Sequence, residues 1–537
     1  MRIREGTILA VLIAGTAALI SFPPIYGRAI CPPNKHFLGF TGLYGPDQAF
    51  YLAWGPRQAQ DGYLLFEDKY NGPTERRMVF NLLWLVMGWT ARLTGLGVAA
   101  VFHIERVLFS IVLLVIIHRV LKEFIPQAGW RLVALVLAAL GSGFGWMLPS
   151  SWGRTPDLWI VESNLFLIML GETNLPAGLC LFLLSLFKGY KALFEHPRHA
   201  TWAGILTLLL GAVYPYAVIS VYAILGVTAA HLAIERRSLK PLLRVYGKIV
   251  LLSVFFVIYD GYLVLTDPNL TAGQKLYRSP DPLKYFLGYG VVSILALVGM
   301  LYSIKDRHRR LYFPLLWAVT TFLLIYAPVA FQMQLIVGVQ VPLVVLAVYG
   351  LSRLSTAMGS LEAAGWRRAL AGWGLLYLLA LSLPTNIHHY AGILADLRRF
   401  DVPEYLDLSD YEAMQWLKAR SSDREVVVAS RPASLVIPVI SHNRVYAGDH
   451  AGVTADFERK MERLNWFFTQ GNAKSDAEIR AFLMQNQIRY IYFDRRLREE
   501  FGRGMLDRLA DLPYVQPAFQ NHEVIILRVE LNSGNRR

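Results

Sequence analysis

Acidic and basic side chains stand in three segments that are otherwise largely apolar, and together they suit one kind of chemistry. The segment "GPDQAFYLAW" contains Asp47, and "DLWIVESNLF" contains Glu162. The third segment, "TAGQKLYRSPDPLKYF", contains Lys275, Tyr277 and Arg278. A carboxylate that can deprotonate an acceptor, together with cations that hold a departing phosphate, is what transfer from a phosphate-activated donor requires. These residues are therefore the first candidates for a site.

Further polar residues occur near the ends of apolar runs. Ionisable groups near a hydrocarbon environment are costly, so their collection at one side of a membrane indicates a functional site. Arg106 is a candidate phosphate ligand by its charge. The supporting candidates are His103, Glu105, Glu172, Asn174, Tyr214, Gln332 and Gln334.

Each candidate also has a purely structural interpretation. Asp47 follows Pro46 and precedes a helix-compatible run, so it could serve as an N-cap. Glu105 and Arg106 could neutralise each other. Other candidates could be interfacial residues: Glu162 as a loop acid, Lys275 and Arg278 as contacts to lipid headgroups, and tyrosines as anchors at the membrane boundary.

Composition indicates a multi-pass membrane protein. The chain has 537 residues, of which 55% are hydrophobic and only 17% are charged, and its mean hydropathy is +0.38. The net charge of +14 does not indicate a nucleic-acid partner, because many basic residues form short clusters between apolar runs. The two cysteines, Cys31 and Cys180, lack the spacing of a metal or redox motif. No metal is indicated and no cofactor is expected.

Apolar runs long enough to cross the hydrocarbon core predict about 11 transmembrane helices. The first, "GTILAVLIAGTAALISF", is interpreted as an uncleaved anchor with a cytoplasmic N-terminus. A short in-and-out pair is expected between Arg198 and Arg236, turning near Pro215. The remaining runs lie near 98–121, 131–149, 174–194, 247–265, 286–304, 313–330, 335–351 and 369–386.

Loop charges set the expected orientation. Alternate loops are rich in arginine and lysine and poor in acids, which predicts that they are cytoplasmic. The loops at 23–77, 150–172 and 266–283, and everything after 390, are then exoplasmic. We expect a transmembrane catalytic domain over 1–398 and an exoplasmic soluble α/β domain over 399–537, with strands near 425–430 and 489–493.

The donor is expected to be a membrane component. The chain contains no Walker-type phosphate loop, and no cytoplasmic domain is predicted that could bind a nucleotide. An activated group already in the bilayer, such as a sugar on a polyprenyl phosphate, fits these restrictions.

The whole chain resembles the membrane-integral glycosyltransferases of the C-type (GT-C) fold. The resemblance is to bacterial members of glycosyltransferase family 39, which include protein O-mannosyltransferases and aminoarabinose transferases. It rests on "GPDQAFYLAW", "DLWIVESNLF", "GAVYPYAVISVY", "QMQLIVGVQVPLVVLAVYGL" and "YEAMQWLKARSSDREVVVAS" with "VYAGDHAGVT". It implies an N-terminal anchor, a long first exoplasmic loop and an exoplasmic C-terminal domain.

The resemblance also implies roles for individual residues. Asp47 matches the acid of the first loop that acts as base or positions the acceptor, and Glu162 matches the acid of the second outer loop. Lys275 and Arg278 fall in the loop that contacts the lipid-linked phosphate in relatives. The chain departs from the family in two places. Asp47 is followed by Gln48 instead of a second acid, and the "FQMQL" segment lacks the arginine that relatives tend to have there.

The expected function is glycosyl transfer, of a hexose or pentose, from a polyprenyl-phosphate carrier to a glycan, lipid or protein acceptor. It would take place at the outer face of a bacterial cytoplasmic membrane, with inversion and with Asp47 as base. A transporter or flippase of lipid-linked sugar would use similar charges. It would need alternating access, for which internal symmetry is the usual sequence signal, and none is visible.

Overall fold

The computed structural model describes most of the chain, and contacts divide the chain into two compact units. The described residues are 5–41, 45–73, 76–267, 278–359, 374, 377–449, 454–469, 474–502 and 504–530. Unit 1 comprises Met1–Phe22, His103–Tyr262 and Tyr277–Gly392. Unit 2 comprises Pro23–Phe102, Leu263–Leu276 and Ile393–Arg537.

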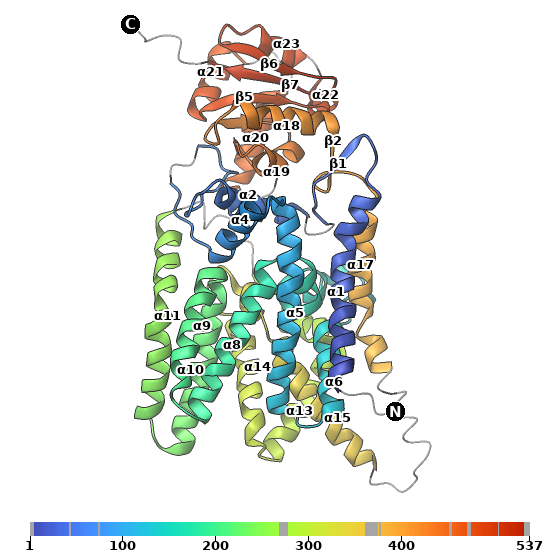
Figure 1. The fold of residues 1–537 in the computed structure, drawn as a ribbon, viewed down its shortest axis with the longest axis vertical. Helices are drawn as coiled ribbons and strands as arrows, with labels where there is room; N and C mark the ends of the chain where they lie inside the picture. The colour runs from blue at the N-terminus through green and yellow to red at the C-terminus, as the bar shows by residue number, and fades with distance from the viewer. Residues whose placement is uncertain are drawn as a thin grey trace. The chain divides into compact units, whose positions relative to one another are not determined.

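Unit 1 is helical (Figure 1). Six helices of the described part are long and apolar enough to cross a membrane: α1 (Glu5–Ala29), α5 (Val98–Phe124), α8 (Asn174–Phe194), α10 (Tyr216–Arg236), α11 (Lys240–Thr266) and α13 (Pro282–Lys305). The other helices of this unit are α6 (Ala128–Leu140), α7 (Leu165–Leu170), α9 (His199–Val213), α14 (Tyr312–Leu324), α15 (Gln340–Gly359) and the first part of α17 (Pro384–Leu397). Short 3₁₀ turns include η4 (Pro156–Leu158), η5 (Val161–Ser163), η7 (Arg309–Leu311) and η8 (Gln332–Ile336).

Helices lie in the expected apolar runs of the described residues, although α6 and α14 are shorter than the runs at 131–149 and 313–330. The runs at 313–330 and 335–351 correspond to α14 and α15, whereas the run at 369–386 lies partly outside the described residues. The total of about 11 spans stays a prediction. The predicted break near Pro215 is confirmed, because α9 ends at Val213, α10 begins at Tyr216 and Pro215 stands between them.

Two glycines let α13 and α15 pack at very short range. A Cβ on Gly299 would lie 1.9 Å from the Leu346 carbonyl oxygen, and a Cβ on Gly350 would lie 2.5 Å from that of Leu295. Small residues are what allow helices in a membrane to approach this closely. These two helices therefore form a closely packed pair.

Unit 2 contains a five-stranded sheet built from the C-terminal part of the chain. The strand order is β4-β3-β5-β7-β6, with β3 parallel to β4 and β5, and β7 antiparallel to β5 and β6. The predicted strands near 425–430 and 489–493 are confirmed as β3 (Val426–Val428) and β5 (Ile488–Phe493). The others are β4 (Arg444–Val445), β6 (Val515–Gln520) and β7 (Ile525–Val529).

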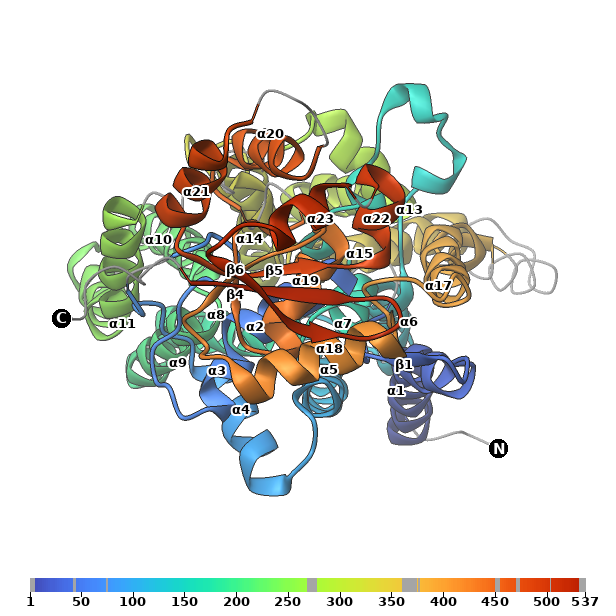
Figure 2. The same cartoon turned by 90° about the horizontal axis from the view of Figure 1, so that it is seen from above.

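Helices cover both faces of this sheet (Figure 2). Successive side chains of a strand point to opposite faces, so Val427 packs in one core while Val426 and Val428 pack in the other. The first core includes α18 (Leu408–Arg420) and α19 (Arg431–Ile440). The second includes α20 (Phe457–Phe468), α21 (Asp476–Gln485), α22 (Arg495–Phe501) and α23 (Gly504–Ala510).

The early segment of the chain completes unit 2. Strand β1 (Lys35–Phe37) pairs antiparallel with β2 (Tyr405–Asp407). Side chains of α2 (Gly45–Trp54) and α4 (Leu82–Thr94) lie in the same core as α18 and α19, and α3 (Pro56–Gln60) packs on α4. The expected loop at 23–77 therefore shares a hydrophobic core with residues beyond 399. A separate exoplasmic domain over 399–537 stays a prediction.

Candidate functional site

Asp47 lies in the first turn of α2, where it is half-buried. The helix begins at Gly45, so Asp47 is its third residue and not the N-cap. An acid in the first turn interacts favourably with the helix dipole, usually by about 0.3–1 kcal/mol. The helix dipole therefore accounts for only a small stabilisation by Asp47. The chemical role of its carboxylate stays a prediction.

Two buried side chains fix the helix that positions Asp47. Gln48 is fully buried; its Oε1 accepts from the Thr41 backbone N at 3.0 Å, and its Nε2 donates to Thr41 Oγ1 at 3.3 Å. Glu404 Oε1 lies only 2.6 Å from where a Cβ on Gly45 would stand, which places a second carboxylate against the first turn of α2. The residue after Asp47 is thus a buried glutamine that fixes α2, and not a second acid.

Glu404 was not predicted as a site residue. It is separated from Asp47 by more than 350 residues of sequence, and it stands in the unremarkable stretch "DVPEYLDL". Only the pairing of β1 with β2 brings this stretch to the early segment, where the Glu404 carbonyl accepts from the Leu38 backbone N at 2.9 Å. No local pattern could have indicated it.

The other acids of the first segment have structural partners. Asp61 Oδ2 lies 2.6 Å from His442 Nδ1. Glu67 forms buried ion pairs with Lys69 and Arg444 at 2.9 and 2.7 Å. Asp68 accepts from the Tyr70 backbone N at 2.7 Å. Asp61, Glu67 and Asp68 are thus engaged in contacts that hold unit 2 together.

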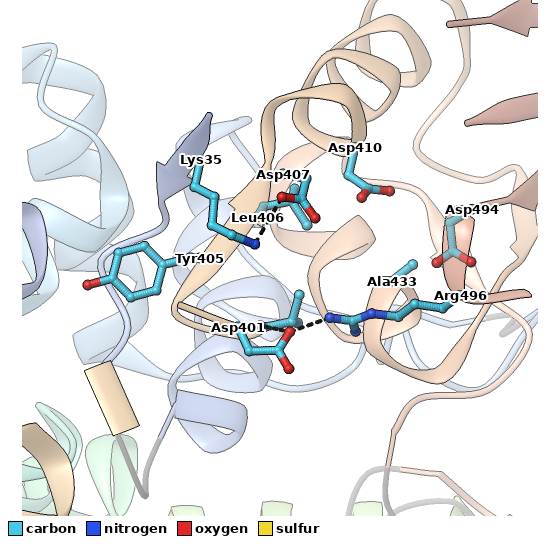
Figure 3. A pocket seen from close by; sticks show the side chains of 10 residues that line it. Lys35, Asp401, Tyr405, Leu406, Asp407, Asp410, Ala433, Asp494 and Arg496 are labelled. Atoms are coloured by element: carbon cyan, nitrogen blue, oxygen red, sulfur yellow. Dashed lines mark hydrogen bonds and ion pairs between the residues drawn. The ribbon is translucent and has the colours of Figure 1, made fainter. Parts of the chain in front are cut away.

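A second group of acids in unit 2 lines a small pocket (Figure 3). Asp407 pairs with Lys35 at 2.9 Å, and Asp401 pairs with Arg496. Burial raises the pKa of Asp410 to about 6, and this carboxylate accepts from the Tyr492 hydroxyl at 2.7 Å. Asp494 caps α22, with its Oδ1 2.9 Å from the Leu497 backbone N. Because each carboxylate is already engaged, this group is part of the architecture.

In unit 1, several predicted residues do come together. Glu162, in η5, accepts at Oε1 from the hydroxyl of Tyr214 at 3.3 Å. Tyr214 is buried between α9 and α10 and lies within electrostatic reach of Glu172. Gly178, on α8, leaves room for the Tyr214 side chain, because a Cβ there would come within 2.7 Å of it. Glu162 thus contacts Tyr214 directly, Glu172 acts on the same tyrosine electrostatically, and we call Glu162, Glu172 and Tyr214 the Glu162 cluster.

Hydrogen bonds of Gln332 hold the segment after Arg278 at the end of unit 1 that contains the Glu162 cluster. Gln332 Oε1 accepts from the Ser279 backbone N at 3.1 Å, and its Nε2 donates to the Ala327 carbonyl at 2.7 Å. Ser279 Oγ lies 3.4 Å from the hydroxyl of Tyr285, which is within electrostatic reach of Glu162. Arg278 itself is exposed. Gln332 therefore positions the backbone beside a cation that is open to a ligand.

Arg106 has a different environment from the one expected of a phosphate ligand. It is fully buried, and its Nη1 donates to the carbonyls of Met169 and Leu170 at 2.8 and 2.7 Å. Its Nη2 donates to the Ile20 carbonyl at 2.8 Å and lies 3.3 Å from His103 Nδ1. Arg106 thus joins α1 and α5 to the end of α7, just before the loop that contains Glu172. This geometry favours a positioning role.

We expect Arg106→Met to lower the stability of the protein by about 3 kcal/mol, because it leaves three buried carbonyl groups without their donor. Thermal melting of the purified protein in detergent measures this loss. The matched control is Arg278→Ala, which removes an exposed arginine and should leave the melting temperature unchanged. A normal melting temperature combined with weak donor binding in Arg106→Met would instead support phosphate binding by Arg106.

The remaining predicted site residues lie on several different elements. Asn174 is buried at the start of α8, close to Glu172. Gln334 lies in η8, which packs against η5. His103 and Glu105 lie on α5 beside Arg106. Lys275 and Tyr277 lie outside the described residues. Within the described ranges, no three histidine, cysteine or acidic residues are grouped so that they could hold a metal ion.

Solved structures of membrane glycosyltransferases share this fold. The mycobacterial arabinofuranosyltransferase AftD aligns with a TM-score of 0.58 at 14% identity, over 98% of this chain and 40% of its own. The archaeal oligosaccharyltransferase AglB from Archaeoglobus fulgidus, solved with an inhibitory peptide and a dolichol-phosphate, aligns with 0.50 at 14% identity, over 90% and 70%. ArnT from Cupriavidus metallidurans in its apo state aligns with 0.50 at 12% identity, over 98% of both chains.

The class of the fold follows from these similarities: the chain is a membrane protein with the GT-C fold. No protein-family model matches the chain, and no curated protein sequence is significantly similar to it. The resemblance seen in the sequence is confirmed at the level of the fold.

Proposed function

We propose that the protein is a glycosyltransferase that moves a sugar from a polyprenyl-phosphate carrier to an acceptor. The observation that supports it is the Glu162 cluster, which lies beside the anchored segment of Arg278 in a chain with the GT-C fold. The solved structures that share the fold include an arabinofuranosyltransferase and an oligosaccharyltransferase. The oligosaccharyltransferase was solved with a dolichol-phosphate. An exposed arginine is suited to a lipid-linked phosphate, because its guanidinium can form two hydrogen bonds to phosphate oxygens.

The roles divide between binding and proton transfer. Arg278, with Lys275 and Tyr277, would bind the phosphate and stabilise it as it departs. Asp47 would deprotonate the acceptor hydroxyl, which would then displace the phosphate at the anomeric carbon with inversion. Glu162, held by Tyr214, would orient a hydroxyl group of a substrate. The bond to the acceptor oxygen forms as the bond to the phosphate oxygen breaks, and the proton passes to Asp47.

The direct test is a transfer assay with the full-length protein in proteoliposomes. Total membrane lipid from the source cells would supply the donor, and mass spectrometry would detect a new sugar on lipid, glycan or protein acceptors. Movement of the lipid-linked sugar across the bilayer without transfer would refute the proposal and favour a flippase.

We expect Arg278→Ala to raise the KM for the lipid-linked donor by about tenfold or more, because hydrogen bonds to charged groups contribute about 1.5–3 kcal/mol. The turnover at saturating donor should change less. A matched control is Arg244→Ala, which removes an exposed arginine of α11 outside the proposed site. Equal KM values in the two variants would exclude Arg278 from donor binding.

The proposed orientation places the loops around the Glu162 cluster, and the residues after 390, on the exoplasmic side. In a chain with Cys31 and Cys180 replaced by serine, single cysteines at Arg307 and Glu458 should react from opposite sides of sealed vesicles. Both positions are exposed, so accessibility does not limit the reaction. Labelling of both from the same side would refute this orientation.

A further inference from the structure

A cavity of about 630 Å³ lies within unit 1 at the ends of four helices. It is bounded by the end of α5, the start of α6, the 306–311 turn between α13 and α14, and the middle of α15. Helix α13 begins just after Ser279 and has 24 residues, which corresponds to about 36 Å at 1.5 Å per residue. The cavity is therefore far from the Glu162 cluster, at the other end of the same helices.

One side of the cavity is apolar. The side chains that form it come from the end of α5, the start of α6, the turn before α14 and the middle of α15: Phe124, Ile125, Trp130, Leu311, Val345 and Val348. Such a wall is suited to a hydrocarbon chain. A tryptophan at a helix end is also typical of the region where the bilayer meets water.

The other side of the cavity has an excess of positive charge. Asp306 is neutralised by Arg353, at 3.0 Å, and accepts from the hydroxyl of Tyr349 at 2.8 Å. Arg309 pairs with Glu235 at 3.0 Å. Arg307 and Arg310 are exposed, and neither side chain makes an ion pair or hydrogen bond with another described residue. Among the residues that the structure describes, these two cationic charges thus have no counter-ion.

Two further features of this turn indicate a place for a ligand. Nδ1 of His308 is buried and makes no hydrogen bond within the described part of the chain, although its ring packs edge-on against Tyr349 at 5.4 Å. Arg307 has a φ of 48°, in a region that residues other than glycine seldom adopt. The turn thus contributes Arg307, His308 and Arg310 to the lining of the same cavity.

We propose that this cavity binds an anionic phospholipid of the adjacent leaflet. Arg307 and Arg310 would contact the phosphate, His308 would add a hydrogen bond, and one acyl chain would lie along the Phe124–Val348 wall. A free phosphate would use the same cations, but it would leave the apolar wall empty. Basic residues beside membrane helices attract anionic headgroups through the same charge excess.

The test uses the full-length protein, purified in a mild detergent and stripped of lipid. Native mass spectrometry would count bound molecules during separate titrations with dioctanoyl phosphatidylglycerol, dioctanoyl phosphatidylcholine and inorganic phosphate. The variant is Arg307→Gln/Arg310→Gln. The matched control is Arg244→Gln/Lys248→Gln, which removes two exposed charges from α11, outside the cavity.

We expect one phosphatidylglycerol to bind at least tenfold more tightly than phosphatidylcholine, and the cavity variant to lose about tenfold or more of this affinity. The control should bind like the original protein. Equal binding of phosphatidylglycerol to the cavity variant would overturn the proposal. Inorganic phosphate that binds as tightly as the lipid would also overturn it, because the site would then recognise a free anion.

Discussion

Asp47→Asn is expected to lower the turnover of sugar transfer by about 10²–10⁴-fold, which is the usual contribution of a positioned general base. Asparagine has nearly the same shape as aspartate and can occupy the same place in the first turn of α2. Gln48 would still bond to Thr41, and Phe50 and Leu52 would remain in the core. The loss would therefore be chemical and not structural.

The change in stability should be small, because the first-turn acid of a helix contributes only about 0.3–1 kcal/mol. Donor binding should persist in Asp47→Asn, because the phosphate is assigned to Arg278 and Lys275. These two readouts, melting temperature and donor KM, separate a lost base from a misfolded protein.

A matched control is Asp61→Asn, which changes another acid of the same segment. Asp61 pairs with His442 at 2.6 Å and is one-third exposed, so it is already engaged structurally. Its turnover should stay within about threefold of the original. If Asp47→Asn were equally active, Asp47 would be only a first-turn acid and the proposed base would have to be another residue.

Local sequence patterns predicted individual strands, a helix break and polar residues within apolar segments. The valine and tyrosine runs at β3 and β5 were recognised because alternating β-branched and aromatic residues favour strands. The break at Pro215 was recognised because proline interrupts an apolar run. Gln332 and Tyr214 stood out as polar residues within apolar segments, and both lie at the same end of unit 1.

Contacts between distant segments were beyond the reach of such patterns. Arg106 was assigned to phosphate because its charge was visible, whereas its partners are backbone carbonyls, which every residue has. Glu404 was missed because only the β1–β2 pairing brings it to α2. Asp61 and Glu67 likewise have partners, His442 and Arg444, that lie about 380 residues further along the chain.

Contacts between distant segments also form a cluster of buried charges around Glu67 in unit 2, which we call the Glu67 cluster. Glu67 is 3% exposed and contacts Lys69 at 2.9 Å, Arg444 at 2.7 Å and Arg77 at 3.3 Å. Asp423 completes the cluster, 2.6 Å from Arg77. It joins the early segment to the loop before β3 and to β4, so removing its central acid would affect two parts of the unit at once.

Glu67→Gln is expected to lower the free energy of unfolding by about 3 kcal/mol, because buried Arg444 loses its ion pair while Lys69 and Arg77 share the remaining acid, Asp423. Lys69 is only 2% exposed, so water cannot replace the lost carboxylate. A thermal melt followed by tryptophan fluorescence would measure the difference. The matched control is Glu499→Gln, whose acid forms an exposed i,i+4 pair with Arg495 and whose loss should leave the melt unchanged.

The effect should depend on pH in a defined direction. Burial alone would raise the pKa of the Glu67 carboxyl, but Lys69 and Arg444 outweigh it and hold this pKa below its usual value. The folded state therefore favours the charged form, and the stabilisation is fully present above the ordinary glutamate pKa of about 4.3. As the pH falls through the lower folded-state pKa, the carboxyl is protonated and the stabilisation is lost. The stability of the original protein should thus approach that of Glu67→Gln in acid, and a gap that stayed constant down to pH 3 would show that Glu67 acts through packing instead of charge.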